Sequence, residues 1–131
     1  MIKIYLTSPD IAHSFLLPIT PPEITVKCAR EVRTYSTAYD GDINFIRSPG
    51  ACEVSFESFL PGIYDRFARN NDKLGIAAVE EIKSFMQSPE PIRMVISGGG
   101  VNIRGTITEF NFWQGKGERI DYRLVFVEKK G

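Results

Sequence analysis

Few residues in this chain are of the types that perform chemistry, and these few do not form a recognised catalytic pattern. His13 is the single histidine, and no nucleophile-elbow motif accompanies it. Asp40 and Asp42 flank Gly41, an arrangement that can bind a cation but that is also a common way to reverse a chain. We therefore expect His13 to be a loop histidine and predict no catalytic, metal-binding or cofactor-binding site.

The two cysteines are interpreted as structural. Cys28 and Cys52 each lie in an alternating run of apolar residues, and a free cysteine in such a strand packs as a small hydrophobe. The spacing contains no C-x-x-C of the kind that binds metal. We expect two buried strand thiols in a protein made in a reducing cytosol.

Two glycine-rich stretches also lack the spacing of a phosphate-binding loop. In Gly98–Gly100 the third glycine of a G-x-G-x-x-G pattern is replaced by Ile103, and the residues that follow predict a strand instead of a helix. Gly115-Lys116-Gly117 lacks the Ser or Thr of a Walker loop. Both stretches are typical of hairpin turns, where glycine supplies a positive φ.

Composition restricts the class of protein further. The 131 residues fit one domain. Lys and Arg number 16 and Asp and Glu number 16, whereas a nucleic-acid-binding protein normally carries a basic excess. No apolar run approaches the roughly 18 residues that cross a bilayer. The chain is therefore expected to be a soluble, non-enzymatic domain.

The hydrophobic pattern is mostly of period two, which predicts strands. One stretch changes to a period of three to four residues and predicts a helix over 75–87. Within the strand expected at 101–113, a bulge near Thr108-Glu109 would return all apolar side chains to one face. We predict a β-dominated α+β fold with an antiparallel sheet or barrel. The expected strands are 1–6, 23–35, 52–59, 92–97, 101–113 and 119–129, with turns at 39–42 and 48–50 and a short apolar piece at 43–46; the predicted core is Val54, Phe56, Ile82, Phe85, Val95, Ile103, Ile107, Tyr122, Leu124 and Phe126.

Two stretches are candidates for contact with other proteins. The proline-rich connector Phe15–Ile24 is apolar but cannot donate regular ladder hydrogen bonds at its prolines. Trp113 lies at a strand end beside polar residues, as interface anchors do. The alternative for the connector is that it packs over its own domain. The candidate interaction residues are Leu16, Leu17, Ile19, Ile24, Phe112, Trp113 and Lys116.

Four stretches resemble, in order and spacing, a family of phage-type baseplate proteins. Phe15–Glu23 (FLLPITPPE) is similar to an F-x-L-P-V-x-P-P-E opening, and Val54–Pro61 (VSFESFLP) to I-S-F-S-S-F-F-P. Ser88–Ile96 (SPEPIRMVI) resembles S-x-K-P-I-R-L-I-I, and Glu118–Glu128 (ERIDYRLVFVE) resembles G-D-V-Y-Y-T-L-E-L-K-E. The family is the N-terminal domain of the lysin-motif-associated baseplate or hub proteins of contractile phage tails, phage-tail-like bacteriocins and related injection systems.

The resemblance implies a fold related to the tail tube and a structural role. The implied protein joins the hub, tube or spike to the surrounding wedge subunits in several symmetry-related copies. It would be assembled in the cytoplasm of the producing bacterium and then belong to the tail particle, with no membrane or nucleic-acid partner. A lysin-motif domain is not expected within residues 1–131. The alternatives are another tail protein, such as a tube-end or tail-completion protein, or a small cytosolic ligand-binding or hydrolytic domain that uses His13 with Asp40 and Asp42.

Overall fold

The computed structural model describes residues 2–28, 31–37, 52–97 and 101–129. Within these residues it is a β-dominated α+β fold with a single antiparallel sheet of eight strands in the order β2-β1-β6-β7-β8-β5-β3-β4. The predicted fold class is confirmed. In chain order the elements are β1 (Lys3–Thr7), β2 (Ser14–Leu16), β3 (Glu23–Cys28), β4 (Glu31–Ser36), β5 (Cys52–Leu60), α1 (Ile76–Met86), β6 (Ile92–Ser97), β7 (Val101–Gln114) and β8 (Ile120–Glu128).

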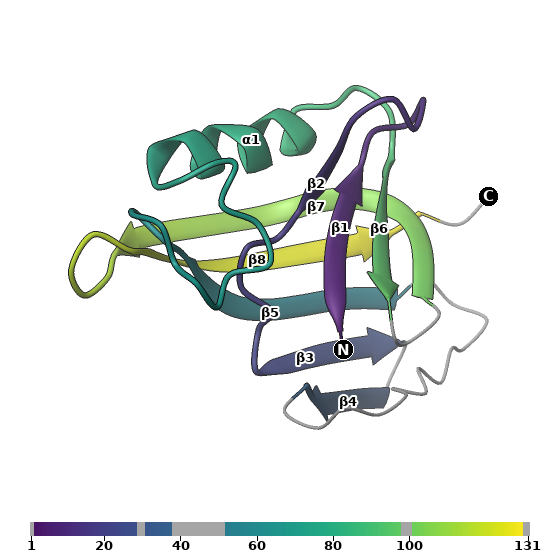
Figure 1. Cartoon of the computed structure of the whole chain (residues 1–131). Coiled ribbons are helices and arrows are strands. Elements are labelled where there is room, and N and C mark those ends of the chain that lie inside the picture. Colours follow the sequence, from purple (N-terminus) through teal and green to yellow (C-terminus); the bar gives the residue numbers. More distant parts are fainter. Residues whose placement is uncertain (1, 29–30, 38–51, 98–100, 130–131) are drawn as a thin grey trace.

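The sheet curves strongly, and the long strand β7 belongs to both of its halves. In Figure 1, β1 and β6 run from top to bottom in front of β7, β8 and β5, which run from side to side. The register of β7 against β8 shifts between Ile107 and Glu109, so the predicted bulge is confirmed. Gly105 permits the close approach of the two strands before the bulge, because a Cβ there would lie 2.1 Å from the carbonyl oxygen of Val127.

The core fills the space enclosed by the curved sheet and the helix. The prediction that Val95 lies in the core is wrong. Val95 lies on the outer face of β6, whereas Ile92, Met94 and Ile96 point into the core. The other predicted core residues are confirmed as buried: Val54, Phe56, Ile82, Phe85, Ile103, Ile107, Tyr122, Leu124 and Phe126.

The helix α1 closes one end of this core. It spans Ile76–Met86 and buries Val79, Ile82 and Phe85, so the predicted helix over 75–87 is confirmed. Ser88 precedes Pro89, and a residue before proline is pushed out of the helical region. Within the part of the chain that the structure describes, no helix is both long and apolar enough to span a membrane.

The connector between β2 and β3 crosses its own sheet. The Thr20 hydroxyl donates to the carbonyl of Ile2 at 2.8 Å, and the Ser58 hydroxyl donates to the carbonyl of Ile19 at 3.1 Å. Leu17 and Ile24 point inward and are fully buried. The connector therefore contributes to the core of its own domain.

The strand expected over 23–35 is in fact two strands. β3 and β4 pair antiparallel with Cys28 opposite Glu31, so the chain reverses direction between them. The intervening Ala29-Arg30 contains none of the usual turn residues, which is why the reversal was not predicted. The predicted turns at 39–42, 48–50 and 98–100 and the apolar piece at 43–46 lie outside the described residues.

Candidate interaction surface

Two regions far apart in the sequence meet at one end of the molecule. One is the β7–β8 hairpin, and the other is the loop 61–75 with the first turn of α1 that follows it. The amide of Gly75 donates to the carbonyl of Pro61 at 2.9 Å, which closes the loop. Gly62 lies directly against the hairpin, because a Cβ there would be 2.0 Å from the carbonyl oxygen of Glu118. The loop and the hairpin are therefore held together by backbone contacts.

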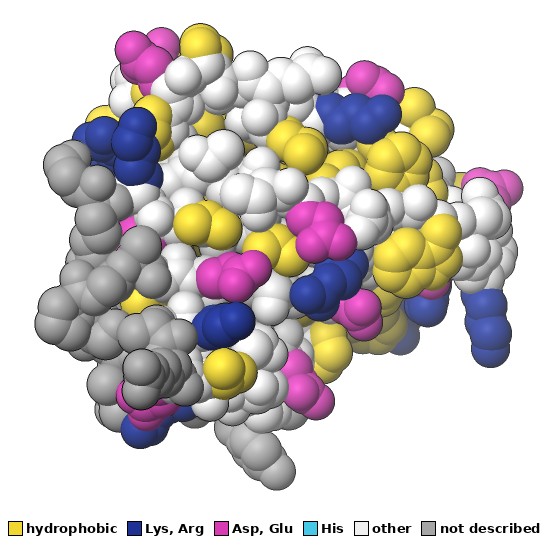
Figure 2. Space-filling view, turned by 180° about the vertical axis from the view of Figure 1, so that it is seen from behind, with side chains coloured by type: hydrophobic (Ala, Val, Ile, Leu, Met, Phe, Trp, Pro, Cys, Tyr) yellow, Lys and Arg dark blue, Asp and Glu magenta, His cyan; other side chains and the backbone are white. Residues whose placement is uncertain are grey.

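Exposed apolar side chains concentrate on these two regions. Among the described residues eight large hydrophobic side chains are exposed, and six of them belong to these regions. Figure 2 shows apolar side chains gathered at its right-hand side, where the β7–β8 hairpin lies. Such a concentration marks an interaction site more often than a scattered exposed residue does. We call five of these six, all but Phe67, the hairpin end: Ile63, Tyr64, Ile76, Phe112 and Trp113.

Basic side chains lie over aromatic rings at the same end. The guanidinium of Arg119 is 4.6 Å from the centre of the Phe59 ring, and Lys83 Nζ is 5.0 Å from that of Phe112. Arg119 also forms an ion pair with Asp121 at 3.1 Å. A hollow of about 350 Å³ between the loop and the hairpin is lined by Phe59 and Arg119, whereas Lys83 and Phe112 lie outside it. Aromatic and arginine side chains around a hollow are the groups that carry most binding energy in protein interfaces.

The structure places the residues that the sequence predicted for interaction in two different regions. It brings Phe112, Trp113 and Lys116 to the hairpin end, with Phe112 and Trp113 39% and 47% exposed. It places the connector residues elsewhere: Leu16 and Ile19 are half-buried, and Leu17 and Ile24 are buried. Leu17 and Ile24 have no surface to offer a partner, so assigning them an interaction role was wrong.

The sequence reasoning did not nominate the other members of the hairpin end. Tyr64 is 72% exposed, and Ile63 and Tyr64 lie in a segment rich in Gly, Asn and Asp. Apolar residues within such a turn-rich stretch were the available signal. Their proximity to Lys116 and Arg119 of the hairpin depends on the pairing of β5 with β8, which no local pattern encodes.

His13 makes contacts that hold two parts of the fold together. It lies between β1 and β2, its Nε2 pairs with a carboxylate oxygen of Glu81, and its ring stacks on Phe85 at 5.3 Å. These contacts attach the β1–β2 hairpin to α1. Across the described ranges no group of three or more His, Cys, Asp or Glu residues could hold a metal. Asp40 and Asp42 lie outside the described residues.

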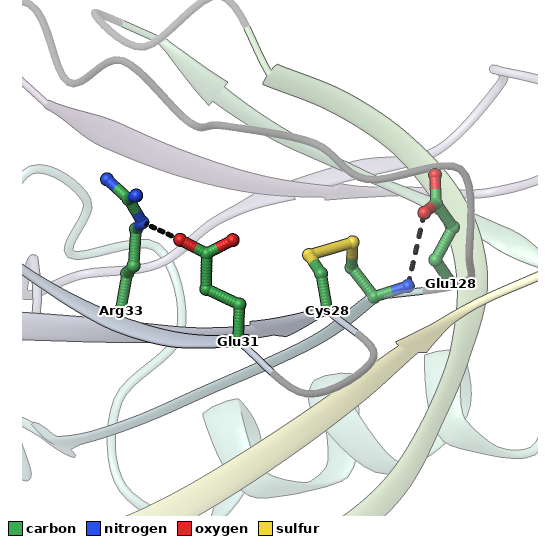
Figure 3. Close-up of a disulfide and its surroundings, with 5 residues drawn as sticks. Cys28, Glu31, Arg33 and Glu128 are labelled. Carbon is green, nitrogen blue, oxygen red and sulfur yellow. Dashed lines mark hydrogen bonds and ion pairs between the residues drawn. A yellow bond between two sulfur atoms is a disulfide. The ribbon is translucent and has the colours of Figure 1, made fainter.

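The cysteines form a disulfide, so the prediction of free thiols was wrong. Cys28 and Cys52 are directly opposite one another in the β3–β5 ladder, with 4.3 Å between their Cα atoms. Figure 3 shows the bond beside Glu128, whose carboxylate accepts a hydrogen bond from the amide of Cys52 at 3.3 Å. The predicted burial of both cysteines was correct. The alternation of apolar and polar residues along one strand does not, however, show which other strand pairs with it.

The sequence of this chain is similar to that of a curated bacterial protein. No family model matches the chain. The chain is 30% identical over 118 residues to the protein described as uncharacterized protein YqbP of Bacillus subtilis strain 168. The aligned region covers 87% of this chain and 53% of YqbP, so the chain spans about half the length of this curated relative.

Proposed function

We propose that this protein is a structural component of the baseplate of a contractile phage tail or tail-like injection particle, joining the hub, tube or spike to wedge subunits. The hairpin end carries the proposal. A small domain with a hollow lined by Tyr64, Lys116 and Arg119, and with Phe112 and Trp113 exposed on the adjoining hairpin, has the surface of an assembly subunit. Several symmetry-related copies would each present this surface to a neighbour.

The positions of the four family-like stretches support the proposal. They fall on β2 with the connector, on β5, on β6 with the segment that follows α1, and on β8. β5 and β8 are neighbours throughout their length, so two of the stretches form one continuous ladder. The resemblance therefore involves residues that build the sheet, which fits a shared fold related to the tail tube.

The proposal gives the chain no catalytic step. His13 is committed to its contacts with Glu81 and Phe85. We therefore expect the His13→Ala variant to leave particle assembly unchanged. The chain would be assembled in the cytoplasm of the producing bacterium and retained in the released particle.

Deletion and complementation in a particle-producing strain test the proposal. Wild-type chain should restore sheathed particles seen by electron microscopy and should copurify with them. Trp113→Ala should reduce copurification at least tenfold. Val32→Ala is the matched control, because Val32 is also exposed (57% against 47% for Trp113) but lies on β4, away from the hairpin end. Normal particles without the chain would contradict the proposal, and immunogold labelling at the tube end would favour a tube-end or tail-completion role.

A further inference from the structure

A row of basic residues crosses the outer face of the sheet far from the tip of the β7–β8 hairpin. Arg93 of β6 lies directly opposite Arg104 of β7. Gly105 lies opposite Glu128, and the Lys129 amide donates to the carbonyl of Arg104 at 2.8 Å, which continues the register by one residue. Neighbouring strands are about 4.8 Å apart. We call Arg93, Arg104 and Lys129 the basic row.

The basic row faces solvent. Ile92, Met94 and Ile103 are buried, so the alternating positions Arg93 and Arg104 point to the other side of the sheet. Arg104 and Lys129 are exposed, and Arg93 is half-buried. Figure 2 shows basic side chains gathered at its upper left, the side on which β6 and the first half of β7 lie.

No acidic side chain in the described part of the chain forms an ion pair with the basic row. Arg93 Nη1 donates only to the amide oxygen of Asn102, at 3.4 Å. By contrast, Arg33 is paired with Glu31 and Arg119 with Asp121. Like charges directly opposite one another on paired strands are destabilising. Glu90 lines the same hollow but forms no ion pair with either arginine, so an anionic partner would relieve part of this repulsion.

The surroundings of the row indicate which anion fits. Arg93 and Arg104 line a hollow of about 400 Å³ whose other walls are Pro9, Glu90 and Pro91. The two prolines offer apolar contact to the aliphatic part of a side chain, while the guanidinium groups can each hold a carboxylate through two hydrogen bonds. Glu90 also lines the hollow and would repel any anion that fills it, so a partner with two separate carboxylates fits better than a continuous line of phosphates. A chain with zero net charge also lacks the basic excess of nucleic-acid binders.

We propose that the basic row binds an acidic helical segment of a partner protein through two carboxylates one helical turn apart. Side chains at positions i and i+4 of a helix are about 5–6 Å apart, close to the spacing of about 4.8 Å between neighbouring strands. The site is distinct from the hairpin end. It rests on strand register and charge alone, so it does not depend on the proposed function.

Binding of designed peptides to the full chain tests this site. The probe is a fluorescent alanine-based helical peptide with glutamates at i and i+4, and a peptide of equal composition with glutamates at i and i+2 is its mismatched control. We expect the matched peptide to bind more tightly and the Arg93→Gln/Arg104→Gln variant to lose at least tenfold in affinity. Arg123→Gln is the control variant, since Arg123 lies on β8 beside Glu57, and it should bind as wild type.

Three outcomes would overturn the proposal. These are equal binding of the two peptides, unchanged affinity in the Arg93→Gln/Arg104→Gln variant, or tighter binding of a single-stranded oligonucleotide than of the matched peptide. Circular dichroism confirms that each variant is folded. If the double variant does not fold, Lys129→Gln replaces it, because Lys129 follows the last residue of β8; we then expect at least a threefold loss, and no loss would overturn the proposal.

Discussion

The connector and the hairpin end are both apolar and irregular, yet they behave in opposite ways. Leu17 in the connector is 1% exposed, whereas Trp113 at the hairpin end is 47% exposed. The connector lies across its own sheet and is fixed there by hydrogen bonds from Thr20 and Ser58. The β7–β8 hairpin instead projects from one side of the sheet (Figure 1).

The difference shows that apolar content alone does not distinguish core from contact surface. A segment becomes core when it runs alongside strands of its own chain that can bind its backbone, as the connector does. A hairpin that extends past neighbouring strands pairs its backbone N–H and C=O groups within itself. Its side chains are then exposed to solvent or contact a partner. Four predictions follow in order of decreasing effect on the free energy of unfolding. The first and the last test this contrast directly, and the other two test the core between them.

Truncation of a side chain in the connector should lower the free energy of unfolding the most. Leu17→Ala should lower the free energy of unfolding by about 3–4 kcal/mol, because it leaves a cavity at a fully buried site. Urea unfolding followed by circular dichroism measures this. Leu16→Ala is the matched control, since Leu16 is only half-buried and should lose less than half as much. Equal losses in the two variants would contradict the assignment of the connector to the core.

Loss of the disulfide should lower the free energy of unfolding by a similar amount. The two cysteines are 24 residues apart in sequence, and closing a loop of that length stabilises a fold by about 3.5 kcal/mol in the chain-entropy estimate. The Cys28→Ser/Cys52→Ser variant should therefore unfold at lower urea than the oxidised wild type, and dithiothreitol should abolish the difference. A wild type insensitive to dithiothreitol, with both thiols reactive to alkylation, would show that the bond does not form.

A buried hydroxyl in the core should produce a smaller, pH-dependent effect. Burial raises the pKa of Tyr122 well above its ordinary value of 10.0, so the unfolded chain loses this proton first. Stability is therefore unaffected below about pH 10 and falls above it, by about 1.4 kcal/mol for each pH unit. Tyr122→Phe should remove this part of the alkaline loss in urea titrations at pH 9 and 11.

The exposed Tyr64 supplies the control for this effect. Tyr64→Phe should leave the alkaline dependence of stability as in wild type, because Tyr64 is 72% exposed. If the two variants had the same pH dependence, Tyr122 would not be the buried titrating group.

The smallest effect on stability is expected at the hairpin end. Trp113→Ala should change the free energy of unfolding by only about 0.5 kcal/mol, as exposed positions usually do, while incorporation into particles falls. Urea unfolding of the purified chain and immunoblotting of purified particles separate the two effects. A loss of stability as large as that of Leu17→Ala would place Trp113 in the core and remove the contrast.

The sequence predicted what depends on local periodicity. Alternation identified the inward face of β5, the three-to-four-residue spacing identified α1, and the change of parity near Thr108 identified the bulge. It did not predict what depends on strand order. The pairing of β3 with β5 places Cys28 against Cys52, and that of β6 with β7 places Arg93 against Arg104. Both pairings join residues that no local pattern relates.

The candidate site was predicted in part for the same reason. Trp113 was recognised from its residue type and its place at a strand end. Ile63 and Tyr64 reach the hairpin only because β5 delivers the loop beside β8. The connector was ambiguous, since prolines exclude regular ladder bonding without specifying whether the segment lies on its own sheet or on another protein.

The continuity of β7 has a mechanical consequence. One uninterrupted strand carries Arg104 near its start and Trp113 near its end, and it is bonded to β6 on one side and β8 on the other. A load applied at the hairpin end would act along the covalent backbone of β7 and as shear on its ladders, a geometry in which many hydrogen bonds resist together. Two partners bound at the two ends of β7 would thus be connected rigidly through this strand.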